Sequence, residues 1–315
     1  MPVIDPPQQG QLSSDTAPAP PKGIKRLRAA ARRTVSACLL PLMQRAGRAY
    51  VGGETVEDAL SVAGRLATER FPSTLGLWDT PEETARRVAD EYLVAIERLA
   101  ASGLDSYVSL KPPALRFDCR LATELATAAH ARDVPLHFDS HGPEVADPSN
   151  AMLETMLRQL SCDHLSTTLP GRWARSLSDA DWAVERGLKV RVVKGQWPDP
   201  ADPDRDMRAG FLEVIDRLAG RARHVRVASH DVPLAAEAVA RLRGAATSCE
   251  LELLFGLPMT RSLRWASENG VGVRIYVPYG KGYIPHAVSQ LRRNPRFVWW
   301  IIKDFLAARS RASRR

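Results

Sequence analysis

Three polar residues with catalytic potential close strand-like runs of this sequence. Lys111 closes YVSLK, Asp139 closes VPLHFD and His230 closes HVRVASH. In folds that alternate strands with helices, ligands bind at the carboxyl ends of the strands. A lysine and a carboxylate brought together there can hold charge or relay a proton. The same residues would also fit surface charges, a loop aspartate and a buried structural histidine, so the pattern indicates a candidate site and leaves its reaction open.

The stretch 271–295, VGVRIYVPYGKGYIPHAVSQLRRNP, indicates which elements would position such side chains. Its VRIYV run is β-branched and aromatic and has the length of a strand. A proline and a glycine then end the strand, and Ile284, Val288 and Leu291 recur at helical spacing. The stretch therefore predicts a strand, a glycine turn and a helix, with Tyr276 near the carboxyl end of the strand.

Further strand-like and helical runs alternate along the chain in the same way. The predicted strands end near residues 111, 139, 169, 195, 230, 256 and 280, and the predicted helices between them cover 121–131, 150–160, 178–186, 208–219, 233–242 and 260–269. Such alternation favours βαβ units and a parallel sheet. Seven strands can be placed in this way.

The residues before this alternating region have a different character. Residues 1–22 are rich in proline, glutamine, serine and aspartate, which predicts a disordered leader. A basic segment and the run VSACLLPLM at 35–43 follow. We interpret this run as a first helix and not as a signal peptide, because Pro41 interrupts it and it lacks a small-residue cleavage site. Glu54 and Thr55 are expected to open one later helix and Thr80 to cap another, so that 23–104 forms an all-helical segment.

Length, charge and cysteine spacing exclude several classes of protein. The 315 residues suffice for one large α/β domain, and no apolar run approaches the roughly 20 residues of a membrane span. The net charge of +8 comes largely from 22–33 and 309–315, which we interpret as solvated ends and not as a nucleic-acid surface. The four cysteines form no CxxC pair, which predicts no metal site and favours a cytoplasmic protein. A basic surface also leaves peripheral contact with an anionic membrane open.

The motifs at the strand ends resemble, in order, those of the proline dehydrogenase family. The resemblance covers roughly residues 48–305, and the resembling motifs are RAYVGGETVEDAL, VSLKPPAL, LHFDSH, VRVVKGQW, ASHD, ELELLFGLP and VRIYVPYG. Members of this family are FAD enzymes on a (βα)8 barrel that oxidise L-proline to 1-pyrroline-5-carboxylate. The resemblance implies an α/β fold with a TIM-type barrel over 105–307, followed by a basic tail at 308–315. The eighth strand that closes such a barrel is not evident in the sequence.

The resemblance also implies roles for particular residues. It makes Lys111, Asp139 and Tyr276 catalytic, and it assigns FAD binding to Arg191, Lys194, Gly195, His230 and Glu252. A cation or a hydrogen-bond donor near the flavin N5 and pyrimidine oxygens would stabilise the anionic reduced ring. Lys111 and Asp139 would lie near the substrate nitrogen, which must be neutral before hydride leaves the neighbouring carbon. The aromatic side chains Tyr276, Tyr283 and Trp197 would pack on an apolar ring.

The chain departs from the family at the helix that binds the substrate carboxylate. The family sequence is YxxRRLxE, and here His286 replaces the tyrosine while Ser289 and Gln290 replace the paired arginines. Bidentate guanidinium–carboxylate recognition is hard to replace. An arginine pair does occur three residues later, which is nearly one helical turn. The candidate substrate-binding residues are therefore Tyr283, His286, Ser289, Gln290, Arg292 and Arg293.

Three functional hypotheses follow from this mixture of retained and altered motifs. The first is oxidation of proline or hydroxyproline, with hydride transfer to flavin N5 and a rearranged carboxylate site. The second is the same chemistry on a proline derivative or another small amine with a masked carboxylate. The third is a non-catalytic relative. For the two enzymes, the resemblance implies a quinone-type electron acceptor and no nucleic-acid partner, while the sequence leaves the oligomeric state open.

Overall fold

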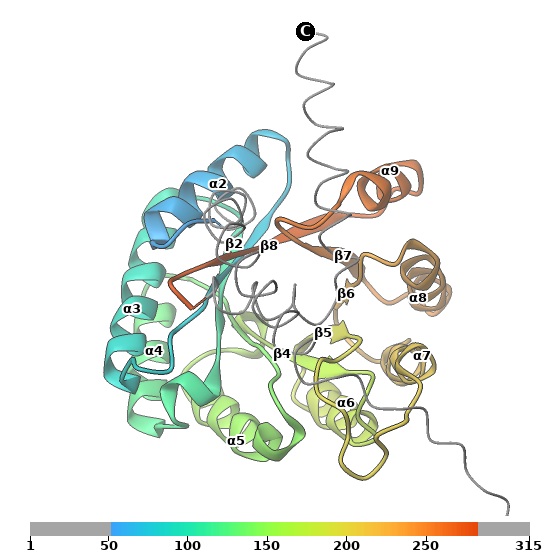
Figure 1. The fold of residues 1–315 in the computed structure, drawn as a ribbon, viewed down its shortest axis with the longest axis horizontal. Helices are drawn as coiled ribbons and strands as arrows, with labels where there is room; N and C mark the ends of the chain where they lie inside the picture. Colours follow the sequence, from blue (N-terminus) through green and yellow to red (C-terminus); the bar gives the residue numbers. More distant parts are fainter. Residues whose placement is uncertain (1–51, 283–315) are drawn as a thin grey trace, which may run out of the picture. The chain divides into compact units, whose positions relative to one another are not determined.

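The computed structural model describes residues 52–282, in which eight parallel strands close into a barrel (Figure 1). The strands are β1 (Ser73–Leu77), β2 (Ser106–Leu110), β3 (Leu136–Phe138), β4 (Leu165–Pro170), β5 (Lys189–Val193), β6 (Val225–Ala228), β7 (Cys249–Leu254) and β8 (Val273–Tyr279). Each strand pairs with the next in the chain, and β1 pairs with β8 to close the sheet. The predicted (βα)8 TIM-type barrel is therefore confirmed.

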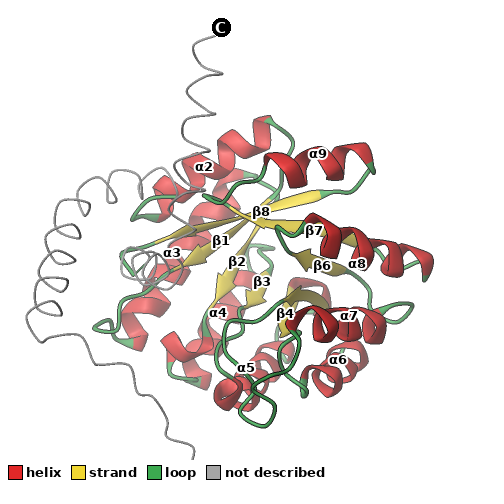
Figure 2. Ribbon diagram, turned by 45° about the vertical axis from the view of Figure 1, so that its right-hand side comes forward, coloured by secondary structure: helices red, strands yellow, loops and turns green. Residues whose placement is uncertain are grey.

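Helices form the outer layer around this sheet (Figure 2). They are α2 (Val56–Thr68), α3 (Ala85–Ser102), α4 (Cys119–His130), α5 (Ala146–Leu157), α6 (Ser176–Glu185), α7 (Met207–Leu218), α8 (Val232–Gly244) and α9 (Thr260–Glu268). Their apolar faces pack against the outward-pointing strand residues, and Leu110, Val192 and Ile275 are fully buried in this layer. None of the helices in the described part of the chain is long and apolar enough to cross a membrane.

The strand that the sequence did not reveal is β1, which lies within the segment predicted to be all-helical. Its sequence STLGL is short, and the glycine weakens the strand pattern. The barrel nevertheless needs it, because Leu75 pairs with Val108 on β2 and with Val277 on β8. The expectation of helices throughout 23–104 is thus wrong at 73–77, where the chain contributes the first barrel strand.

The two predicted helix starts have different outcomes. Thr55 caps α2 through a capping box: its hydroxyl accepts the N–H of Asp58 at 3.2 Å, and the Asp58 carboxylate accepts the N–H of Thr55 at 3.1 Å. The cap predicted at Thr80 is wrong. The next helix begins later and is capped by Thr84, whose hydroxyl accepts the N–H of Arg87 at 3.3 Å.

The interior of the barrel carries charged and polar side chains, where (βα)8 barrels usually carry bulky branched ones. Thr74 on β1 donates a hydrogen bond of 2.8 Å to Glu252 on β7. Because β1 and β7 are not neighbours in the sheet, this bond crosses the interior. The ring nitrogens of His137 each lie 2.7 Å from a hydroxyl of β4, on Ser166 and Thr168. The strands therefore direct their polar residues inward.

Several sequence predictions concern residues outside the described range. These are the leader at 1–22, the first helix at 35–43, the helix that begins after the last strand, and the basic tail at 308–315. They remain predictions.

Candidate active site

Arg191 and two carboxylates form the centre of the polar cluster inside the barrel. The Arg191 side chain on β5 is 5% exposed, and its Nη1 donates to Asp139 Oδ1 at 2.6 Å. Its Nε and Nη2 donate to Glu252 Oε2 and Oε1 at 2.7 and 2.8 Å. Removing one partner from a buried ion pair typically costs about 3–5 kcal/mol, because the remaining charge is uncompensated. The guanidinium is thus held in one orientation by β3 and β7.

Asp139 follows β3 and joins the cluster to two further predicted residues. Its Oδ2 accepts a 2.8 Å hydrogen bond from the Tyr276 hydroxyl and lies 3.9 Å from Lys111 Nζ. Burial alone would raise the pKa of Asp139, but the charges of Arg191 and Lys111 and the tyrosine hydrogen bond hold that pKa below its ordinary value. Asp139 is therefore an anion. The predicted catalytic residues Lys111, Asp139 and Tyr276 do lie together.

Lys111 is the cation of the cluster that can most readily give up its charge. Its side chain is 9% exposed, and its Nζ donates to the backbone carbonyl of Leu77 at the end of β1. Burial lowers the pKa of Lys111 below its ordinary value, while the nearby Asp139 acts in the opposite direction. A lysine of this kind can exchange a proton with a substrate amine.

Tyr276 on β8 owes its position to a glycine. A Cβ atom at Gly76 on β1 would lie 2.0 Å from the Tyr276 hydroxyl oxygen, so only glycine leaves room for the phenol ring. Burial, the charge of Asp139 and the hydrogen bond to it raise the pKa of Tyr276 well above its ordinary value. Tyr276 is therefore a neutral hydrogen-bond donor, and its ring centroid lies 5.1 Å from the Arg191 guanidinium carbon.

Glu252, predicted from the resemblance to contact the cofactor, lies beneath Arg191 with a side chain that is 2% exposed. Besides Arg191, it accepts hydrogen bonds from Thr74 Oγ1 at 2.8 Å and from the Tyr107 hydroxyl at 3.2 Å. Its contacts thus orient Arg191. The sequence analysis did not predict Tyr107 or Thr74 as site residues. Tyr107 lies four residues before Lys111, so the alternation of side chains along a strand places both on the inward face.

His230 follows β6 and connects the backbone of two later segments. Its Nε2 accepts the N–H of Leu254 at 2.9 Å, so the proton lies on Nδ1, which donates to the carbonyl of Pro258 at 3.2 Å. Burial lowers the pKa of His230, although the bond to Pro258 acts in the opposite direction. Both ring nitrogens are used within the protein, so a role at the cofactor would use the face or edge carbons of the ring.

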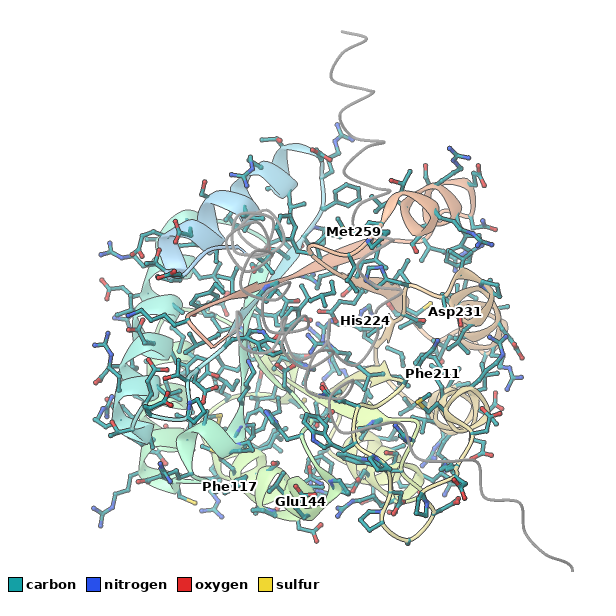
Figure 3. All side chains as sticks on the ribbon, in the orientation of Figure 1. Phe117, Glu144, Phe211, His224, Asp231 and Met259 are labelled. Atoms are coloured by element: carbon teal, nitrogen blue, oxygen red, sulfur yellow. The ribbon has the colours of Figure 1, made fainter. Side chains whose placement is uncertain are left out.

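Lys194 and Gly195 lie outside the buried cluster. Lys194 Nζ donates to Asp231 Oδ2 at 3.0 Å, and its side chain is 40% exposed. Asp231 lies at the start of α8, where it caps the helix (Figure 3). Gly195 has a positive φ of 96°, and a Cβ there would lie 2.9 Å from Arg172 Cβ and 3.0 Å from Pro170 Cβ.

A basic cavity of about 440 Å³ opens beside these residues. Its lining includes four cations, Arg172, Lys194, Arg205 and Arg208, and two acids, Asp204 and Asp206. Arg172 Nε is buried and has no hydrogen-bond partner among residues 52–282. Guanidinium and ammonium groups recognise phosphate oxygens. The cavity therefore fits the diphosphate of a dinucleotide.

The predicted substrate-binding residues cannot be placed in this geometry. Tyr283, His286, Ser289, Gln290, Arg292 and Arg293 all lie outside the described residues. Of the proposed aromatic wall, Trp197 is 37% exposed and its ring centroid lies 5.8 Å from that of His141, which follows β3. The wall is thus only partly tested.

Fold and cluster together define a barrel enzyme with buried charges at the carboxyl ends of its strands. No family model matches the sequence. Proline dehydrogenase 1 of Bacillus subtilis subsp. natto is 26% identical over 279 residues, covering 82% of this chain and 90% of that protein. Proline dehydrogenase of Deinococcus radiodurans is 24% identical over 280 residues, covering 82% and 89%. These matches confirm the resemblance to proline dehydrogenases.

Solved structures of similar fold include proline utilization A (PutA) proteins. The protein from Bdellovibrio bacteriovorus aligns with a TM-score of 0.67 at 16% identity, over 82% of this chain and 33% of that one. The protein from Corynebacterium freiburgense aligns with a TM-score of 0.65 at 17% identity, over 91% and 34%. This chain thus spans about a third of the PutA chains it matches, and the likeness establishes the shared barrel fold.

Proposed function

We propose that this protein is an FAD-dependent oxidoreductase that converts L-proline to 1-pyrroline-5-carboxylate. The relatives named proline dehydrogenase support the reaction class, since they align over most of both chains. The observation that carries the proposal is the buried cluster of Asp139, Arg191 and Tyr276, with Lys111 beside it. This cluster places a fixed cation, a fixed anion and a titratable amine at the end of the barrel where ligands bind.

The residues present fit the cofactor at two places. Arg172, Lys194, Arg205 and Arg208 would hold the diphosphate, since they line one cavity and outnumber its acids. Arg191 would hold the flavin ring, because its orientation is fixed in advance by two carboxylates. When bound, FAD supplies a two-electron acceptor for hydride.

The substrate side of the reaction is assigned to Lys111 and Asp139. Hydride can leave the carbon next to the substrate nitrogen only when that nitrogen is neutral. Lys111, with its lowered pKa, takes the proton from the incoming amine, and Asp139 remains anionic beside the resulting ammonium. Tyr276, held by Asp139 from β8, offers its ring to the apolar face of the pyrrolidine.

The altered helix sequence favours one alternative substrate class. With Ser289 and Gln290 where the family has paired arginines, a carboxylate would need another cation, such as Arg292 or Arg293. A proline derivative without a free carboxylate would not need one. We therefore keep a modified cyclic amine as the second candidate, together with a quinone-type acceptor and peripheral contact of this basic chain with an anionic membrane surface.

The visible spectrum of the purified protein tests the proposal. The oxidised-flavin band should be present and should bleach on anaerobic addition of L-proline. A band that bleaches only with proline methyl ester would favour the modified amine. Absence of the band after reconstitution with FAD would exclude both enzyme functions and leave the non-catalytic relative.

A further inference from the structure

A second basic cavity lies at the opposite end of the barrel from the candidate active site. It has a volume of about 120 Å³ and is lined by residues at the amino ends of the strands. Ser106 begins β2, Leu165 begins β4 and Lys189 begins β5. A cavity of this volume has room for several waters or for one tetrahedral oxyanion.

Arg226 on β6 lines this cavity and has one donor that is unused among residues 52–282. The residue is 6% exposed, its Nε donates to Glu250 Oε1 at 3.0 Å, and its guanidinium lies 4.5 Å from the ring centroid of Tyr107. Its Nη1 is buried and has no hydrogen-bond partner within 52–282. A buried donor without a partner costs about 1–3 kcal/mol, and more when it is charged. Arg226 Nη1 thus lacks a hydrogen-bond acceptor among residues 52–282.

Lys189 adds a cation that has no partner among the described residues. It lies two residues before Arg191 on β5 and therefore shares its inward face. Lys189 is half-buried, and its ammonium makes no hydrogen bond or ion pair with any residue that the structure describes. Burial lowers its pKa, and the charge of Arg226 lowers it further, while Asp163 acts in the opposite direction.

The acids around the cavity are already engaged by other groups. Glu250 accepts from Arg226 and from Arg274, at 3.0 and 2.9 Å, and lies 3.4 Å from His224, which Figure 3 labels. Asp163 pairs with Arg223 at 2.6 Å, and Asp105 pairs with Arg274 at 3.1 Å. Arg274 has a partner for each of its three nitrogens, because its Nη1 also donates to a backbone carbonyl at 2.8 Å. Among the charged residues around the cavity, Lys189 is therefore the one whose charge has no ion-pair partner within 52–282.

We propose that this cavity is a binding site for a small oxyanion, held between the Lys189 ammonium and Arg226 Nη1. The cavity size and the two unused cationic donors fit inorganic phosphate or a short carboxylate such as acetate. Neither donor belongs to the cluster around Asp139, so the site is separate from the proposed catalytic one and does not depend on the proposed reaction.

Thermal unfolding and calorimetric titration of the full chain test this site. Sodium phosphate and sodium acetate, each compared with sodium chloride at matched ionic strength, should reveal binding as a raised melting temperature and a saturable heat. The salt that gives the larger effect identifies which oxyanion the cavity prefers. If neither salt differs from chloride, the proposal is wrong.

Two matched variants locate the bound anion. Lys189→Gln should weaken binding about 10- to 100-fold, the loss expected for one charged hydrogen bond, and Lys189→Arg should retain it. Arg98→Gln, which removes an exposed cation on α3 away from both cavities, should leave the oxyanion affinity unchanged. Unchanged affinity in Lys189→Gln, or an equal loss in Arg98→Gln, would show that the anion does not bind at this cavity and would overturn the proposal. Because Lys189 is half-exposed at a strand end, its replacement should not prevent folding.

Discussion

The Tyr276 hydroxyl lies 2.8 Å from Asp139 Oδ2 and joins β8 to β3 across the mouth of the barrel. The two strands are not neighbours in the sheet, so this bond is part of the site and not of the sheet pairing. It fixes the direction of a carboxylate whose other oxygen binds Arg191. One phenol thus orients the anion that we assign to substrate binding.

Tyr276→Phe should lower kcat/KM for L-proline roughly 10- to 100-fold while FAD remains bound, because one hydrogen bond to a charged group is lost. Steady-state kinetics and the flavin content of the purified variant measure this. Tyr279→Phe is the matched control, since the buried Tyr279 hydroxyl has no hydrogen-bond partner within 52–282. It should leave kcat/KM unchanged and should not lower the free energy of unfolding, because it removes a buried hydroxyl that has no partner within 52–282. Equal effects of the two variants would contradict the role of Tyr276.

Variants of Glu252 should show whether this residue orients Arg191 or contacts the cofactor directly. Glu252→Ala should lower the free energy of unfolding by about 3–5 kcal/mol, because it leaves one side of a buried guanidinium unpaired. Glu252→Gln should cost less, because the amide oxygen still accepts a hydrogen bond from Arg191. Urea denaturation of the apoprotein gives both values. Wild-type stability in Glu252→Ala with weakened FAD binding would instead indicate direct contact with the cofactor.

The lowered pKa of Asp139 should make the protein sensitive to acid. Because the folded-state pKa lies below the ordinary value of 3.8, folding favours the ionised carboxylate. This stabilisation is complete above about pH 4 and is lost as the pH falls through the folded-state pKa. The free energy of unfolding should therefore fall less steeply with acid in Asp139→Asn than in the wild type. Parallel curves for the two proteins would show that Asp139 does not contribute.

Gly76→Ala should disturb the site through a steric clash with Tyr276. Overpacking of a filled core costs about 1–3 kcal/mol, and the displaced phenol should also lose its bond to Asp139. Gly64→Ala in α2 is the matched control, since a Cβ there would meet nothing within 4 Å. It should stabilise the protein by about 0.4–1 kcal/mol. Melting temperatures and kcat/KM of both variants measure the contrast, and a neutral Gly76→Ala would mean that the ring adjusts.

The sequence predicted most of the barrel because β-branched runs and helical periodicity recur clearly after residue 105. It failed at β1, where the glycine that admits Tyr276 also weakens the strand pattern. Lys111 and Asp139 were predicted as site residues because they lie at strand ends, and Arg191 because its motif resembles that of the family. Glu252 was assigned to the cofactor from the family resemblance, which does not show how deep in the barrel the side chain lies. Lys189 and Arg226 were not predicted as site residues, because they lie at or near the amino ends of their strands, where the sequence pattern predicts no ligand.

The charged interior has a consequence for how this chain can fold. Arg191 meets Glu252 across 61 residues of sequence, Asp139 meets Tyr276 across 137, and Thr74 meets Glu252 across 178. A partly assembled barrel would desolvate these groups before their partners arrive. Half-barrel intermediates should therefore be poorly populated, and assembly should be slow and cooperative, as expected when stabilising contacts are distant in sequence. A fragment ending before β7 would leave Arg191 without Glu252 and should not form an independent folding unit.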